Sequence, residues 1–244
     1  MNLSLVIITK NEERHLAKTI ESCIGLCNEL VIVDSGSTDK TLEIGKQYNA
    51  KTLQKDFLGF GKQKQLAVNS ASNDWVLCLD ADEVLTEELK FNIANELVNP
   101  KYNAYILTRC NKFLGRYLRY GAGYPDCSIR LFNRKNANWS DDMVHEKVIV
   151  NCTVGKITGD YLHDSAESLD KYLVKQNQYT TTQAGAMFAR GKKCKLSKLL
   201  ISPTWHFIKY YFIKHGFLDG IPGLIHILIG SWNSFIKYAK LYSR

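Results

Sequence analysis

A chain of 244 residues, 45% of them hydrophobic, is long enough for one large α/β domain with an appendage but short for two full domains. Its seven cysteines form no C-x-x-C pair and no zinc-like spacing, so a reducing cytosol fits best. The net charge of +8 is concentrated in residues 187–244, which hold ten Lys/Arg and one acid, whereas the rest of the chain holds 22 Lys/Arg and 23 acids.

The first half of the chain alternates apolar runs with segments of helical periodicity. Residues 3–9 are typical of a strand in a parallel sheet and lack the basic region and cleavage site of a signal peptide. Further strands are expected at residues 30–33, 50–53 and 75–79, and helices at residues 15–23, 41–48 and 62–71. This alternation predicts a parallel sheet with right-handed crossovers. No G-x-G-x-x-G follows the first strand, which disfavours a dinucleotide-binding unit.

The pattern changes after residue 100. Short strand-like runs separated by polar or glycine breaks indicate a mixed second half instead of further β-α-β units. These runs cover residues 104–109, 128–132, 147–150 and 154–162. A long helix is expected over residues 165–190, ended by Gly191.

The run from Trp75 to Leu79 delivers two carboxylates, Asp80 and Asp82, at its C-terminal end. Ligands bind open α/β sheets at this edge, and alternate residues of a strand share a face, so both acids can turn toward one ion. Hard oxygen ligands suit Mg²⁺ or Mn²⁺ bound together with substrate phosphates. We therefore interpret both acids as metal and diphosphate ligands. The alternative is helix capping, but Thr86 and the acids after it already account for the next helix start.

Residues 199–244 are dense in aromatic and aliphatic side chains interleaved with Lys and His. Charged residues and helix breakers interrupt this region too often for a transmembrane helix, which needs about 20 apolar residues. Basic amphipathic helices with aromatic anchors lie in the membrane interface and favour anionic lipid. We expect this region to associate peripherally with a membrane surface. The alternative is a helix pair that packs on the domain or forms a homodimer. No nucleic-acid motif accompanies the charge, so no nucleic-acid partner is expected.

Several motifs together support a family resemblance. Residues 5–12 (LVIITKNE), 32–41 (IVDSGSTDKT) and 79–83 (LDADE) resemble the inverting family 2 glycosyltransferases with the GT-A fold. Later segments resemble the lipopolysaccharide core β-1,4-glucosyltransferase subgroup; they are GFGKQKQ (59–65), FLGR (113–116), YPD (124–126), RLF (130–132), VHE (144–146) and GFLDG (216–220). The resemblance covers nearly the whole chain. It is highly specific for fold and reaction class and much less so for the exact sugar.

The resemblance implies a nucleotide-sugar site at the ends of the first strands. Thr9, Asn11 and Glu12 would border the nucleotide, and Asp34 matches the acid that contacts uracil. Lys64 sits where a basic residue would reach the donor diphosphate. The donor would be a UDP-hexose, and the acceptor a lipid-linked saccharide.

The resemblance also implies the metal ligands and the base. Asp80 and Asp82 match the metal-binding Asp-x-Asp, with Asp80 also facing the donor, and His163 would be an additional metal or phosphate ligand. Glu146 is our choice for the catalytic base, because inversion needs one group to take the proton of the attacking hydroxyl. Asp126 is a second candidate, which would alternatively hold acceptor hydroxyls.

Other candidates for the base and plainer roles stay open. Three further groups in the second half could act as the base, namely Asp141, Asp142 and His145. The two acids are more typical of a solvated turn, and His145 of a packed or hydrogen-bonding histidine. Lys64 could be merely solvated, and Asp34 could merely cap its turn. His163, at the end of a strand-like run, could equally be structural.

Two residues within these motifs differ from the family pattern. Ser35 replaces the second acid of the commoner Asp-Asp-Gly-Ser version, and Gln65 stands where the subgroup suggests asparagine.

We predict a GT-A α/β domain over residues 1–165, with a mostly parallel sheet flanked by helices, and a C-terminal amphipathic helical appendage over residues 166–244. The predicted enzyme is a hexosyltransferase, moving glucose from UDP-glucose onto a saccharide such as lipopolysaccharide inner core. The appendage would hold it peripherally at the inner, cytoplasmic face of the cytoplasmic membrane, where such an acceptor is presented. One alternative is a non-catalytic membrane-bound module derived from a transferase. The other is an aspartyl-nucleophile phosphatase, whose Asp-x-Asp normally ends the first strand instead of the fourth.

Overall fold

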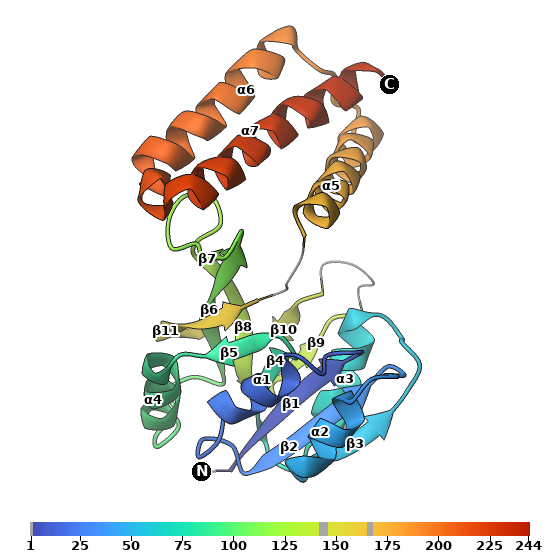
Figure 1. The fold of residues 1–244 in the computed structure, drawn as a ribbon, viewed down its shortest axis with the longest axis vertical. Coiled ribbons are helices and arrows are strands. Elements are labelled where there is room, and N and C mark those ends of the chain that lie inside the picture. Colours follow the sequence, from blue (N-terminus) through green and yellow to red (C-terminus); the bar gives the residue numbers. More distant parts are fainter. Residues whose placement is uncertain (1, 142–145, 165–167) are drawn as a thin grey trace. The chain divides into compact units, whose positions relative to one another are not determined.

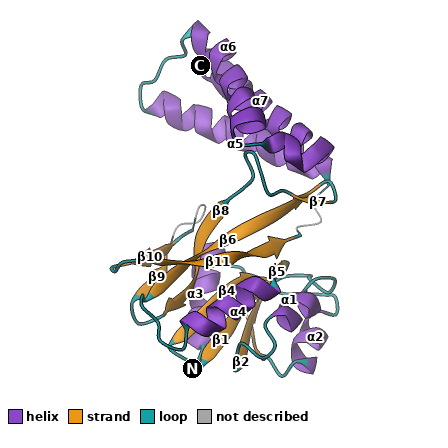
Figure 2. Ribbon diagram, turned by 90° about the vertical axis from the view of Figure 1, so that its left-hand side faces the viewer, coloured by secondary structure: helices purple, strands orange, loops and turns teal. Residues whose placement is uncertain are grey.

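The computed structural model describes residues 2–141, 146–164 and 168–244 (Figure 1). Their contacts divide the chain into two compact units, Met1–Arg109 with Asp126–His163, and Cys110–Pro125 with Asp164–Arg244. The first unit is a sheet with helices, and the second is mainly helical (Figure 2). The segment Cys110–Pro125 groups with the C-terminal helices by its contacts, although it lies far from them in the sequence.

The N-terminal half of the first unit is the predicted parallel arrangement. Strand β1 (Leu3–Thr9) pairs in parallel with β2 (Glu29–Asp34) and β4 (Trp75–Asp80), and β2 pairs with β3 (Lys51–Gln54). The connecting helices are α1 (Leu16–Ser22), α2 (Thr41–Gln47) and α3 (Phe60–Ser70). Each predicted strand and helix of this half is therefore confirmed, with small shifts of its ends.

The later part of the sheet contains antiparallel pairs, which confirms the mixed second half. The sheet order is β3-β2-β1-β4-β8-β6-β11-β5, formed in its later part by β5 (Glu83–Leu85), β6 (Ala104–Phe113), β8 (Asp126–Asn133) and β11 (Gly155–His163). Strand β9 (Ala137–Trp139) forms a hairpin with β10 (Val148–Val150), and β7 (Arg116–Tyr117) pairs with the end of β6. Strands β5, β7 and β9 are too short for a periodicity argument and were not predicted. Helix α4 (Glu87–Glu96) begins after Thr86, whose side chain accepts from Leu89 N–H as expected of an N-cap.

Alternate residues of the central strands fill two cores, one on each face of the sheet. On one face, Leu5 and Ile7 pack with side chains of α1 and α4. On the other, Val6 packs with α3 and the β9–β10 hairpin. The sheet edge where these buried strands end is thus held between two packed layers.

The second unit contains α5 (Leu169–Ala189), α6 (Leu196–Ile208) and α7 (Gly220–Tyr242). A π turn, Lys209–Ile213, and a 3-10 turn, Gly216–Asp219, connect α6 to α7. The predicted start of α5 at residue 165 lies outside the described residues, and the helix begins after its N-cap Ser168. Among the described residues no single helix is both long and apolar enough to cross a bilayer; Leu196–Ile213 and Gly216–Tyr242 meet that test only as a pair, bent by 75° at the break between them.

Candidate active site

The C-terminal ends of three neighbouring parallel strands bring the predicted residues together. In the register of β1 and β2, Thr9 lies opposite Asp34, and in that of β1 and β4, Ile8 lies opposite Asp80. Since parallel strands end at one edge of a sheet, polar groups from distant motifs gather there. The expectation that the Asp-x-Asp emerges at the sheet edge is confirmed.

The loops that follow β1 and β2 are interlocked by hydrogen bonds. The Asn11 side chain accepts from Thr38 N–H at 2.8 Å, and Ser37 Oγ accepts from Asn11 N–H at 2.8 Å. Thr41 Oγ1 accepts from Glu12 N–H, also at 2.8 Å. The first two sequence motifs therefore form one polar surface, and Asn11 and Glu12 are part of it.

Asp34 is buried and is used by its own turn. Its Oδ1 accepts from the N–H groups of Gly36 and Ser37 at 2.9 Å each, and the Ser37 hydroxyl donates to Oδ2. The capping role is therefore present, and contact with uracil remains a prediction. Thr9 Oγ1 is buried too, and it has no hydrogen-bond partner within the described part of the chain.

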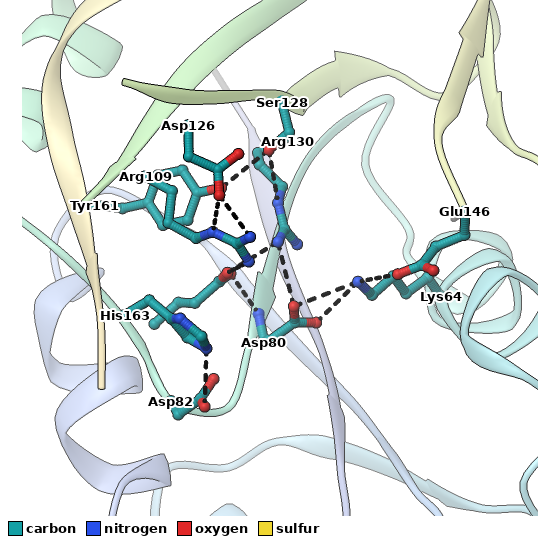
Figure 3. A network of polar contacts seen from close by, with 11 residues as sticks. Lys64, Asp80, Asp82, Arg109, Asp126, Ser128, Arg130, Glu146, Tyr161 and His163 are labelled. Carbon is teal, nitrogen blue, oxygen red and sulfur yellow. Dashed lines mark hydrogen bonds and ion pairs between the residues drawn. The ribbon is translucent and has the colours of Figure 1, made fainter. Parts of the chain in front are cut away.

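Lys64 lies between Asp80 and Glu146 in the charged site (Figure 3). Its Nζ is 3.1 Å from Asp80 Oδ1 and 3.1 Å from Glu146 Oε1, and it lies 4.9 Å from the centre of the Trp139 ring. The residue is only 7% exposed, so the alternative of a merely solvated lysine is wrong. Three residues that sequence reasoning assigned separately to diphosphate, metal and base are thus in direct contact.

The β9–β10 hairpin holds Glu146 beside Lys64. Ser140 and Lys147 close the loop between them, with Ser140 N–H donating to Lys147 O at 2.8 Å. Gln65 on α3 accepts from Trp139 N–H at 2.7 Å, which ties the hairpin to the helix. The departure at residue 65 therefore has a structural role. Two other candidate bases, Asp142 and His145, lie outside the described residues.

A buried ion network behind the Asp-x-Asp was missed by sequence reasoning. Arg130 Nη2 donates to Glu83 Oε1 at 2.8 Å and to Asp80 Oδ2 at 3.2 Å, and Glu83 Oε2 accepts from Asp80 N–H at 2.9 Å. Asp126 receives two hydrogen bonds from Arg109, at 2.7 and 2.9 Å, and Arg109 lies 3.6 Å from Glu83. The sequence does carry one signal for this network. Arg130 stands inside the apolar run of β8, and a buried charge requires a partner.

The charges of this network shift the pKa values of two acids, Asp80 and Glu83. Burial alone would raise the pKa of Asp80, but the positive charges of Arg130 and Lys64 outweigh it and hold that pKa well below its usual range. Burial raises the pKa of Glu83, and the nearby Asp80 charge adds to this rise, against Arg130. Asp80 is therefore a permanent anion at neutral pH.

Asp80 Oδ1 also has a feature that suits a ligand. It is a buried oxygen that makes no hydrogen bond among the described residues, because the ion contact with Lys64 Nζ lacks hydrogen-bond geometry. One oxygen of Asp80 is thus left for a cation or a donor group.

Asp82 and His163 form a second polar pair at the same edge (Figure 3). His163 Nε2 lies 3.2 Å from Asp82 Oδ2. Burial lowers the pKa of His163, but the hydrogen bond and charge of Asp82 outweigh it and raise that pKa overall. No group of three or more His, Cys, Asp or Glu side chains within residues 2–141, 146–164 and 168–244 is arranged to hold a metal. The metal role of Asp80, Asp82 and His163 stays a prediction.

Comparison with known proteins identifies the family. The family model described as "Glycosyl transferase family 2" matches residues 4–150. This chain belongs to glycosyltransferase family 2. An uncharacterised glycosyltransferase of Rickettsia typhi is 34% identical over 98% of this chain and 86% of its own length. The lipopolysaccharide core biosynthesis glycosyltransferase LpsC of Rhizobium meliloti is 32% identical over 99% of this chain and 92% of its own length.

A solved structure supports the same fold. Residues 1–349 of S. aureus TarS, crystallised in complex with UDP-GlcNAc, cover 100% of this chain and 91% of the TarS chain with a TM-score of 0.52 and 13% identity. The predicted GT-A α/β fold with C-terminal helices is confirmed. The chain is a glycosyltransferase, and the phosphatase alternative is wrong.

Proposed function

We propose that this glycosyltransferase transfers glucose from UDP-glucose, with inversion, onto a lipid-linked saccharide such as the lipopolysaccharide inner core. The observation that carries the proposal is the contact of Lys64 with both Asp80 and Glu146, which places a cation for a diphosphate next to a carboxylate for a proton. The likeness to LpsC over the whole chain supports the acceptor class. The UDP-GlcNAc complex of TarS supports a UDP-sugar donor.

Each side chain has a defined task in this reaction. The Lys64 ammonium stabilises the charge that develops on the diphosphate as the sugar bond breaks. Glu146 takes the proton of the acceptor hydroxyl as that oxygen attacks the sugar carbon from the opposite side. Asp126, oriented by Arg109, binds acceptor hydroxyls. The buried Arg130 donates to the carboxylate of Asp80 and Glu83 accepts from its backbone N–H, which together keep Asp80 in place.

The donor atoms at the sheet edge are of the chemical kinds that bind a divalent cation, Mg²⁺ or Mn²⁺. Asp82 Oδ2 and His163 Nε2 are 3.2 Å apart, close to the spacing of neighbouring ligands around one ion, and Asp80 Oδ1 is a buried oxygen without a hydrogen bond in the described structure. Asp80, Asp82 and His163 would hold the ion. Such an ion, when bound, supplies Lewis-acid neutralisation of the leaving diphosphate.

Titration calorimetry with UDP, GDP and ADP, each with Mn²⁺ and with EDTA, tests this assignment. We expect binding of UDP alone, weakened by EDTA, and an Asp82→Ala variant that binds UDP about tenfold or more weakly in Mn²⁺ and no longer responds to EDTA. The matched control is Asp74→Asn, which removes an exposed acid at the opposite end of β4. Preference for GDP or ADP would remove UDP-glucose as donor. An Asp82→Ala variant with unchanged EDTA response would remove the metal role.

We also propose that the second unit binds the anionic inner surface of the cytoplasmic membrane. Helices α6 and α7 expose large apolar side chains, with Trp205 56% and Trp232 59% exposed. The one acid of residues 187–244, Asp219, is buried, so the exposed charges of this region are basic. Aromatic anchors together with basic residues are the features that hold a helix in an anionic interface.

Co-sedimentation of the full chain with lipid vesicles tests this attachment. We expect binding to phosphatidylglycerol-containing vesicles and little binding to pure phosphatidylcholine. Replacing Trp205 and Trp232 together with serine should reduce the bound fraction at least about fivefold. Phe91→Ser, which removes a 66% exposed aromatic ring from α4, should leave binding unchanged. Equal loss in both variants, or no loss in either, would contradict the proposal.

A further inference from the structure

A single ammonium group serves two acids in the site. Lys64 Nζ lies 3.1 and 3.3 Å from the two Asp80 carboxylate oxygens and 3.1 Å from Glu146 Oε1. Lys64 is buried, and its Nζ lies over the Trp139 ring, 4.9 Å from the ring centre. Two of the three ammonium protons are donated to Asp80 Oδ2 and Glu146 Oε1, so a further strong anion competes with these carboxylates for the charge of Lys64.

The two acids are held differently. Asp80 is fixed independently of Lys64, because Arg130 donates to its carboxylate at 3.2 Å and Glu83 accepts from its backbone N–H at 2.9 Å. For Glu146, Lys64 is the one hydrogen-bond donor among the described residues. Glu146 is therefore the partner that can leave when a new anion arrives.

We propose that Glu146 and the donor diphosphate compete for Lys64, so that donor binding releases the carboxylate that deprotonates the acceptor. This inference rests on the proposed function for the identity of the incoming diphosphate. Diphosphate oxygens form short, charge-assisted hydrogen bonds with an ammonium and carry more charge than one carboxylate. Once released, Glu146 has both oxygens available for the acceptor hydroxyl. Activation of the acceptor then waits until the donor is in place.

The competition predicts a change in UDP affinity that would not occur if the base made no contact with Lys64. Glu146→Gln removes the competing charge and should bind UDP about threefold to tenfold more tightly than the wild type, measured by calorimetry in Mn²⁺. Because any lost acid raises the affinity for an anion slightly, Asp74→Asn is the matched control. It removes an acid paired with a lysine, Lys135 at 2.7 Å, at the opposite end of β4, and should change UDP affinity by less than about twofold.

A second measurement uses the wild-type chain. Trp139 lies under Lys64, so movement of the ammonium toward a diphosphate changes the surroundings of its ring. UDP should alter the Trp139 emission, taken as the difference between the wild type and Trp139→Phe, whereas uridine, which lacks the diphosphate, should not.

The outcomes separate this inference from the proposed function. Equal UDP affinities of Glu146→Gln and wild type, or a Trp139 emission that does not respond to UDP, would overturn the competition and leave the donor assignment intact. Absence of UDP binding by both folded proteins would overturn the donor assignment and the competition together.

Discussion

Replacing Glu146 with glutamine should lower kcat for sugar transfer about 10²–10⁴-fold, the usual contribution of a positioned general base. Glutamine keeps the size of the side chain but cannot accept the proton of the acceptor hydroxyl. The affinity for UDP should not fall but rise about threefold to tenfold, because Lys64 stays in place and no longer shares its charge with Glu146. Initial rates of transfer to a lipid-linked acceptor, compared with UDP binding on the same preparation, measure both effects.

The control for this variant is Asp126, the first residue of β8. Asp126 is paired with Arg109 at 2.7 Å and does not contact Lys64, so Asp126→Asn should act mainly through a raised KM for the acceptor. If instead Asp126→Asn lost more of kcat than Glu146→Gln, the two roles would have to be exchanged.

Replacing Arg130 with methionine should destabilise the first unit by about 3–5 kcal/mol. Arg130 is buried, and its removal leaves the fully buried Glu83 without the partner that now lies 2.8 Å away. The same change also removes one of the two cations beside Asp80. Urea denaturation followed by circular dichroism measures the free energy of unfolding.

Two further variants show whether the loss comes from the buried charge. Adding Glu83→Gln to Arg130→Met should recover part of the stability, because the buried carboxylate that has lost its partner at 2.8 Å is gone. Lys135→Met, which breaks the exposed pair with Asp74, should cost less than about 1 kcal/mol. An Arg130→Met variant as stable as Lys135→Met would show that the network contributes little to the fold.

Local pattern predicted most of the first unit. Buried parallel strands occur in a sequence as continuous apolar runs, so the sequence predicted β1, β2 and β4. The polar residues at their ends could therefore be placed at one edge of the sheet. The same argument placed His163 at the end of β11. It did not detect β5, β7 and β9, because two or three residues carry no measurable period.

Local sequence patterns were enough to assign most strands and helices, the charged edge of the sheet and the family. Which charges meet depends on the tertiary structure. Lys64 and Glu146 are 82 residues apart, and Asp80 and Arg130 are 50 apart. Their contacts depend on β8 pairing with β4 and on the β9–β10 hairpin packing against α3. Periodicity reports which face of an element is buried but not which element lies against it, so the partners of a buried charge become known only when the sheet order is known.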